Sequence, residues 1–173
     1  MQPGPNAATQ QKDAQAAESH RSGRMSDGTR LNTNQRTDDE LGIRVTGKGT
    51  YTNPLLKRCW SCSNGRSGTG GIYNVAALEE GDSPGHTHPE LIEAIPGPGD
   101  AGLASKPGET SYVFTRAGLF GVERTEVGYR VRQIEGPRLR GDDLQDMIKR
   151  IDSWNRNDGA AAAKGVTCSS KSC

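Results

Sequence analysis

The clearest pattern of hydrophobic and polar positions lies near the end of the chain, in residues 142–155. Apolar residues recur there at helical spacing and share one face: Leu144, Met147, Ile148, Ile151 and Trp154. The preceding Gly-Asp-Asp, residues 141–143, supplies an N-cap and acidic side chains for the first turn. This pattern predicts an amphipathic helix packed on the rest of the protein, with Trp154 in the core.

Shorter segments with β-branched and aromatic residues predict strands between about residues 40 and 135. The expected strands are 41–45, 50–52 and 72–78, the segment that ends at the histidines near residue 86, and a meander formed by 111–115, 119–123 and 127–134. Strands followed by one strong helix predict an α+β fold, with a mixed or antiparallel sheet and a packed C-terminal helix.

The two ends of the chain differ from this middle part. Residues 1–37 are polar and low in aromatic side chains, which predicts a disordered or loosely held arm that is dispensable for folding. Within the arm, residues 6–18 favour a helix by propensity but have no apolar stripe to bury, and His20 is interpreted as solvated. We expect one domain over residues 38–157 and a flexible tail over 158–173.

Charge and hydropathy limit the classes of partner. The chain has 22 basic and 21 acidic side chains, which gives no electrostatic argument for binding nucleic acid or an anionic membrane. It has neither an apolar run long enough to span a bilayer nor a classical signal peptide. Membrane insertion is therefore not expected. The protein is either cytoplasmic or secreted by another route, as a module of its own or as part of a longer chain.

The four cysteines form two local pairs, Cys59 with Cys62 and Cys168 with Cys173. Two disulfides are slightly favoured and would indicate an oxidising destination. A four-thiolate zinc site competes with them, although the spacing of the second pair weakens it. A redox role for Cys59 and Cys62 is disfavoured, because a Gly/Ser loop follows them rather than a helix.

Candidate chemistry is concentrated in Gly-His-Thr-His-Pro, residues 85–89. On an extended segment His86 and His88 point to the same face, where two imidazoles suit a borderline metal such as zinc. Pro89 would end the strand. Asp100 follows after Pro-Gly-Pro-Gly, and a returning loop would bring its carboxylate to the same ion. Two plainer interpretations stay open: an exposed His-x-His loop that binds nothing, and an aspartate that only caps a short helix over residues 101–104.

The string His86-Thr87-His88-Pro89, seven residues, then Gly97-Pro98-Gly99-Asp100 resembles the JAB/MPN metallopeptidases, the JAMM family. That family has His-x-His-Pro, six to eight residues, Ser-x-x-Asp, and an upstream glutamate on an early strand. Glu40 occupies the position of the glutamate, and Gly97 stands where the family has serine. Residues 111–118 are similar to the strand and turn that follow the metal helix in bacterial JAB-like domains, so the resemblance covers about residues 38–135.

The resemblance implies a zinc-dependent peptidase or isopeptidase with a JAB/MPN-like fold. His86, His88 and Asp100 would hold Zn²⁺, and Glu40 would be the general base for a water at the fourth position. It implies a protein or peptide substrate. Bacterial domains of this type also occur as toxin modules delivered into target cells, for which a cognate immunity protein is an expected partner.

Gly97 lacks the side chain with which the family serine steadies the oxyanion, and this leaves two outcomes open. The chain is either a slower or differently arranged peptidase, or a non-catalytic metal-binding or interaction module of the same fold. Rivals to Glu40 as the catalytic carboxylate are Glu79 and Glu80, in a turn, and Glu90 and Glu93, after Pro89.

Overall fold

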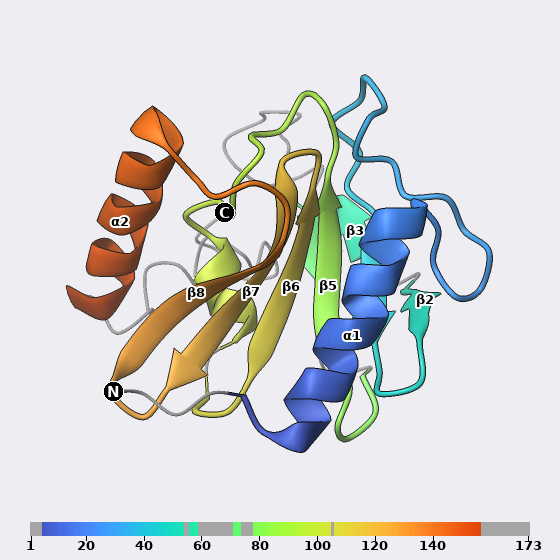
Figure 1. Ribbon diagram of the computed structural model, residues 1–173, viewed down its shortest axis with the longest axis horizontal. Helices are drawn as coiled ribbons and strands as arrows, with labels where there is room; N and C mark the ends of the chain where they lie inside the picture. Colours follow the sequence, from blue (N-terminus) through green and yellow to red (C-terminus); the bar gives the residue numbers. More distant parts are fainter. Residues whose placement is uncertain (1–4, 54–55, 59–70, 74–77, 105, 157–173) are drawn as a thin grey trace.

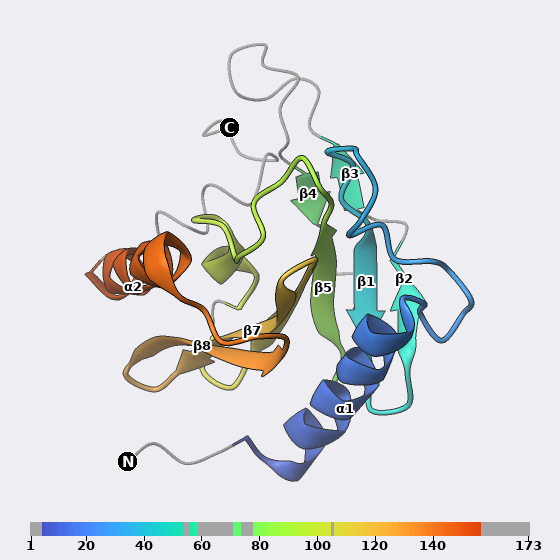
Figure 2. The same ribbon diagram turned by 45° about the horizontal axis from the view of Figure 1, so that its top comes forward.

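The computed structural model describes residues 5–53, 56–58, 71–73, 78–104 and 106–156 (Figure 1). Its main feature is a six-stranded mixed sheet in the order β2-β1-β5-β6-β7-β8. The strands of this sheet are β1 (Gly42–Val45), β2 (Thr50–Thr52), β5 (Ser83–His88), β6 (Thr110–Thr115), β7 (Gly118–Thr125) and β8 (Gly128–Glu135). A separate two-stranded ribbon pairs β3 (Leu56–Arg58) with β4 (Gly71–Tyr73), as Figure 2 shows. The predicted α+β class is confirmed.

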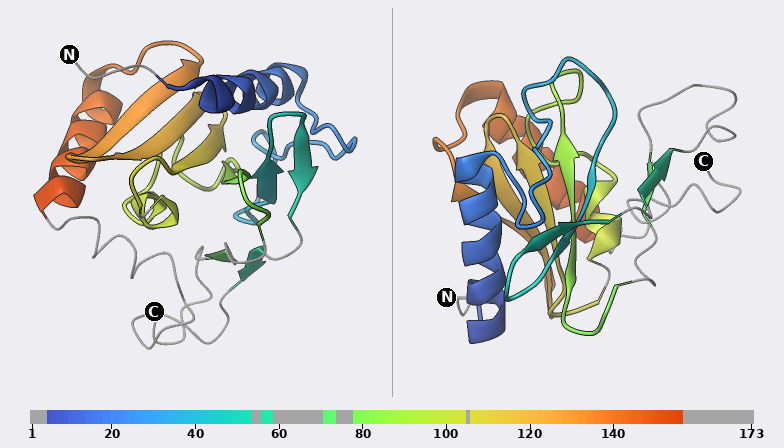
Figure 3. Two further views of the ribbon diagram at one scale, coloured as in Figure 1. Left: turned by 90° about the horizontal axis from the view of Figure 1, so that it is seen from below. Right: turned by 90° about the vertical axis from the view of Figure 1, so that its right-hand side faces the viewer.

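Three helical elements accompany the sheet: α1 (Ala7–Ser22), α2 (Gly141–Arg156) and the short 3₁₀ helix η3 (Asp100–Leu103). Helix α1 lies on one face of the sheet, whereas η3 lies on the other, as the view from below in Figure 3 shows. Helix α2 packs beside β8. Within the described part of the chain, no helix is long and apolar enough to cross a bilayer.

The only parallel pairing among the described strands joins β5 to β6, with His86 opposite Val113 and His88 opposite Thr115. Parallel neighbours need a crossover connection. Here it runs from Pro89 to residue 109 and contains η3, so the chain leaves β5, passes over one face of the sheet and returns in β6. This crossover carries Asp100 back towards the histidines.

The sheet separates two apolar clusters, because alternate side chains of a strand point to opposite faces. The first cluster contains Ala16, Ala17, Met25, Leu31, Ile43, Val45, Tyr112, Phe114 and Leu119. The second contains Ile95, Ala101, Val113, Phe120, Val122, Tyr129, Met147 and Trp154. His86 is opposite Val113 in the sheet and therefore faces the second cluster.

Most of the predicted elements are confirmed. The strands expected at 41–45 and 50–52 are β1 and β2, and the expected meander is β6, β7 and β8. Of the strand expected at 72–78, Gly71–Tyr73 is β4 and residues 74–77 lie outside the described residues. The same is true of all four cysteines and of the predicted tail, residues 158–173.

The predicted C-terminal helix is α2, and Trp154 is buried as expected. Its apolar face is only partly covered. Met147 is buried, whereas Leu144 and Ile148 are 39% and 44% exposed. The helix therefore anchors through the end that carries Trp154, whose indole N–H donates to the carbonyl of Pro98 at 2.8 Å.

The N-terminal segment differs from the loosely held arm that its composition predicts. Asn6 caps α1 by accepting a hydrogen bond from the Thr9 amide at 2.9 Å. Ala16 and Ala17 are buried in the first cluster, and Met25 and Leu31 follow them there. A helix with little apolar surface can dock closely when its buried residues are small. Small residues such as alanine do not form a marked hydrophobic stripe, so the sequence pattern did not indicate that this helix is docked.

Polar contacts complete the docking of α1. Asp13 accepts hydrogen bonds from the Tyr112 hydroxyl at 2.6 Å and from Arg132 at 2.5 and 3.1 Å. Lys12 bonds the Ser83 hydroxyl at 2.8 Å. His20, expected to be solvated, is partly buried instead, with Nε2 3.0 Å from the carbonyl oxygen of Thr115. Because a carbonyl only accepts, this ring nitrogen carries a proton.

Candidate metal centre

The two histidines lie on β5, a strand between β1 and β6 in the middle of the sheet. Their side chains share one face because they are two residues apart on a strand. Both are buried, with 3% of His86 and 2% of His88 exposed, and their Nε2 atoms are 3.2 Å apart. Strand β5 ends at His88, immediately before Pro89, as the sequence predicts.

Glu40 reaches the pair because of the register between β1 and β5. Gly42 is opposite His86, and Leu41 and Thr87 exchange two hydrogen bonds, so Glu40 continues the antiparallel alignment beside His88. Its Oε1 is 3.4 Å from His88 Nε2. The turn residues Glu79 and Glu80 are exposed, as expected, and Glu90 is exposed as well.

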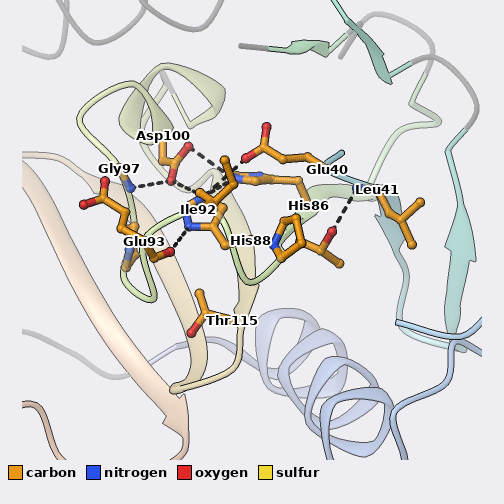
Figure 4. Close-up of polar contacts among 12 residues, drawn as sticks. Glu40, Leu41, His86, His88, Ile92, Glu93, Gly97, Asp100 and Thr115 are labelled. Carbon is orange, nitrogen blue, oxygen red and sulfur yellow. Dashed lines mark hydrogen bonds and ion pairs between the residues drawn. The ribbon is translucent and has the colours of Figure 1, made fainter. Parts of the chain in front are cut away.

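Asp100 approaches from the crossover, on the opposite side from Glu40 (Figure 4). Its Oδ1 is 3.2 Å from His86 Nε2, and its Oδ2 is 3.4 Å from His88 Nε2. The expected helix begins at Asp100 itself, with Gly99 as the N-cap and no side-chain cap. Asp100 therefore does not serve as its cap. Instead Oδ2 accepts a hydrogen bond from the Gly97 amide at 2.7 Å.

The spacing of these donor atoms suits a metal ion. Two atoms bound to one tetrahedral zinc at about 2.0–2.1 Å lie about 3.3 Å from each other. His86 Nε2 lies 3.2 Å from both His88 Nε2 and Asp100 Oδ1, and His88 Nε2 lies 3.4 Å from Glu40 Oε1, so these three separations are close to that value. Glu40, His86 and His88 form a group that could hold a metal ion, and Asp100 adds a further carboxylate within reach. The mixture of nitrogen and oxygen donors is one that zinc accepts.

The charges at the site depend on one another. Burial lowers the pKa of His86, but the carboxylates of Asp100 and Glu40 outweigh it and raise the pKa to about 9. For Asp100 the effect of burial has the opposite sign and raises the pKa of its carboxyl. His86 and His88 outweigh this effect and hold the pKa of Asp100 well below its usual range. In the metal-free protein a proton on His86 therefore supplies positive charge between the carboxylates, where a cation would otherwise be.

The tautomer of His88 is set by the first part of the crossover, residues 89–99, which is called the crossover loop below. Its Nδ1 is 2.9 Å from the backbone carbonyl of Glu93, which can only accept, so Nδ1 carries a proton and Nε2 is the nitrogen that faces the site. A carbonyl in this position is typical of metal-binding histidines. For His86, by contrast, Nδ1 is buried and has no hydrogen-bond partner among the described residues.

Gly97 lies against the site through its backbone rather than through a side chain. A Cβ built at this position would lie 3.7 Å from Asp100 Oδ2 and 3.3 Å from Glu93 Oε1. The position of the family serine is thus adjacent to the proposed metal ligand, and the chain presents only the Gly97 amide there.

All four predicted site residues, Glu40, His86, His88 and Asp100, lie together in the structure, and their roles stay predictions. Sequence reasoning missed the supporting groups: the carbonyl of Glu93, and Arg150 and Trp154 on α2, which hydrogen-bond the crossover loop. The sequence indicates Glu93 only as a candidate carboxylate, whereas its backbone carbonyl is what contacts His88. No local pattern marks a backbone carbonyl or a distant arginine as part of a site.

The fold and the site define an α+β protein in which two buried histidines and a partly buried glutamate form a group that could hold a metal ion. Comparisons with known protein families, with curated proteins and with solved structures find no match for this chain.

Proposed function

We propose that this chain is a zinc-dependent peptidase or isopeptidase of the JAB/MPN type. The observation that carries the proposal is the convergence of Glu40 and Asp100, from two separate segments, on His86 and His88. The donor separations match a tetrahedral ion, and the His88 tautomer presents Nε2 to it. The partly buried carboxylates of Glu40 and Asp100 supply the negative charge that a divalent cation requires.

In this proposal His86 Nε2, His88 Nε2 and Asp100 Oδ1 hold the ion. Asp100 Oδ2 is already engaged by the Gly97 amide, which leaves Oδ1 directed towards His86. A zinc ion bound there would lower the pKa of a water molecule towards about 7 and polarise a substrate carbonyl. The side chains of Asp100 and Glu40 retain 14% and 16% exposure, against 4% and 3% for His86 and His88, so the two carboxylates are the parts of the site nearest to solvent.

Glu40 is the proposed general base. Its Oε1 lies beside His88 Nε2 at 3.4 Å, near enough to the ligand set to reach a water on the ion. Oε1 would accept a proton from that water and deliver it to the leaving nitrogen of the substrate. The Gly97 amide is occupied by Asp100, so it is not free to serve as an oxyanion donor in place of the missing serine hydroxyl.

The test compares two substitutions in the full chain. Metal content is measured by mass spectrometry, and hydrolysis is measured with a fluorogenic peptide library and with ubiquitin-like isopeptide conjugates. We expect about one zinc per chain in the wild type, loss of zinc in His86→Ala, and retention of zinc without hydrolysis in Glu40→Gln. Full hydrolysis by Glu40→Gln would show that this glutamate is not the base.

One observation favours a second candidate, a metal site without catalysis. Glu40 Oε1 is as close to His88 Nε2 as Asp100 Oδ2 is, so Glu40 could complete a closed set of four protein ligands. Structural zinc sites are closed in this way, whereas catalytic ones keep an open position. A large loss of zinc affinity in Glu40→Gln would favour this candidate, since a base can be removed without loss of the ion.

A further inference from the structure

The crossover loop, residues 89–99, holds the site together but contains no strand or helix of its own. Backbone carbonyls of such a loop must find partners elsewhere. Two of them accept hydrogen bonds from α2: Arg150 Nη1 donates to Pro96 at 2.8 Å, and the Trp154 indole donates to Pro98 at 2.8 Å. These contacts fall on the residues immediately before and after Gly97.

Arg150 is connected to the metal centre along two short paths. Its Nη1 bonds the carbonyl of the Pro96–Gly97 peptide, and the N–H of that same peptide bonds Asp100 Oδ2 at 2.7 Å. Its Nη2 bonds the Glu93 carboxylate at 2.8 Å, and the backbone carbonyl of Glu93 accepts from His88 Nδ1 at 2.9 Å. Only 18% of the Arg150 side chain is exposed.

We propose that Arg150 is a positioning residue of the metal centre. It fixes Asp100 through the Gly97 amide and His88 through the Glu93 carbonyl. This inference rests on the metal site of the proposed function but not on hydrolysis. A guanidinium suits the task because its planar fork serves two acceptors at fixed geometry, whereas a lysine ammonium is a single point charge. The cation on the Pro96 carbonyl also polarises the peptide and strengthens its N–H as a donor to Asp100.

Arg150 could instead serve only to dock α2 on the loop. The chain offers a matched control for that possibility, because Asn155 is a second polar residue of α2 that bonds another element. Its Oδ1 accepts from the Tyr129 amide of β8 at 2.7 Å, a contact that does not involve the crossover loop. A residue that only docks the helix should behave like Asn155 when zinc affinity is measured.

The experiment measures the dissociation constant for Zn²⁺ alone by competition with a chromogenic chelator, using the full chain. We expect Arg150→Met to bind zinc about 10- to 100-fold more weakly than the wild type, as is typical of lost support to metal ligands. Arg150→Lys should fall between the two, because it keeps the charge and loses the fork. Asn155→Ala should retain wild-type affinity. Circular dichroism of the metal-free proteins verifies that each variant is folded.

A second readout uses the reciprocity of coupled sites. If Arg150 links α2 to the ion, zinc should slow hydrogen exchange of α2 amides in the wild type and in Asn155→Ala, and clearly less in Arg150→Met, where only Trp154 still joins α2 to the loop. If Arg150→Met does not fold, zinc affinity and hydrogen exchange of α2 are measured on Arg150→Lys instead, and these two measurements then test the positioning role.

The outcomes separate the two proposals. Wild-type zinc affinity in folded Arg150→Met would overturn the positioning role and leave the proposed hydrolysis untouched. Weakened affinity in Arg150→Met, with no hydrolysis by any variant, would support the positioning role and overturn the proposed peptidase.

Discussion

At the scale of single residues, the two histidines of β5 are held in different ways. Nδ1 of His88 hydrogen-bonds the Glu93 carbonyl, and its Nε2 faces the other side chains of the site. Nδ1 of His86, by contrast, has no hydrogen-bond partner among the described residues. The carboxylates around His86 raise its pKa to about 9, against the effect of burial, so His86 carries a proton that it must release when a metal binds.

Gly97 is the residue at which the resemblance can be tested most directly. We expect Gly97→Ser to raise any hydrolytic rate by up to about 100-fold, because it restores an oxyanion donor. Gly97 is not among the glycines with a left-handed backbone, and the atom nearest to the new Cβ, Glu93 Oε1, ends a flexible side chain. The measurement is the rate constant for hydrolysis at saturating substrate.

Gly97→Ala is the matched control, because it adds the same Cβ without a hydroxyl. If serine and alanine at this position gave the same rate, the hydroxyl would not act on the oxyanion, and the position would matter only through its backbone.

At the scale of elements, α1 shows how a polar helix becomes part of a core. Its contacts with the sheet are made by small residues such as Ala16 and by charged groups that pair with strand residues. Arg132 is shared between Asp13 of α1 and Glu123 of β7, whose carboxylate it bonds at 2.9 Å. The helix is therefore specified by a network of complementary polar groups, and this network determines where it docks.

Removal of Asp13 should destabilise the protein. Asp13→Ala would leave the Tyr112 hydroxyl and part of Arg132 without their acceptor in a largely buried place, and breaking such a pair costs about 3–5 kcal/mol. The measurement is the free energy of unfolding from urea denaturation. Glu18→Ala on the same helix is the control, because Glu18 is 69% exposed and pairs with Arg21 at 3.3 Å, a surface contact worth about 0–1 kcal/mol.

Composition predicts that residues 1–37 are dispensable for folding. Because α1 and the residues after it pack in the first cluster, we expect instead that the protein requires them for stability. Their deletion would uncover Tyr112 and Phe114 and remove Met25 and Leu31 from the first cluster. A truncated chain that begins at Thr37 and melts at the wild-type temperature would contradict the docking of α1.

At the scale of the whole molecule, the metal centre joins segments that are distant in the sequence. Glu40 precedes β1, the histidines lie on β5, and Asp100 begins η3 in the crossover. An ion held by the histidines and Asp100, with Glu40 beside it, would link β5 to the crossover loop, and through Arg150 and Trp154 to α2.

We therefore expect zinc to raise the thermal midpoint of unfolding. Free zinc at about 1,000 times its dissociation constant would add about 4 kcal/mol, which corresponds to a shift of about 10 °C for a domain of this size. Differential scanning calorimetry with zinc or with a chelator measures the shift. The metal-free His86→Ala variant should not respond. Magnesium should have little effect on the wild type, because it prefers oxygen ligands. An equal response of wild type and His86→Ala would place the bound ion elsewhere.

Features that depend on local periodicity could be predicted from the amino-acid sequence. The apolar spacing of residues 142–155 predicts α2, alternation and β-branched residues predict the meander, and a two-residue spacing puts His86 and His88 on one face. Pro89 ends β5 because it cannot donate to a ladder. These properties follow from neighbours in the chain, so a single sequence is enough to predict them.

Features that depend on partners distant in the chain could be recognised only in the folded protein. The docking of α1 requires Asp13 to meet Tyr112 and Arg132, about one hundred residues away. The family resemblance suggested Glu40, but the register of β1 against β5 is what brings its carboxylate to His88. Arg150 has no recognisable pattern around it, because its role depends on a carbonyl and a carboxylate that the fold places beside α2. Such complementarity is a property of surfaces that meet on folding, and local sequence carries no sign of it.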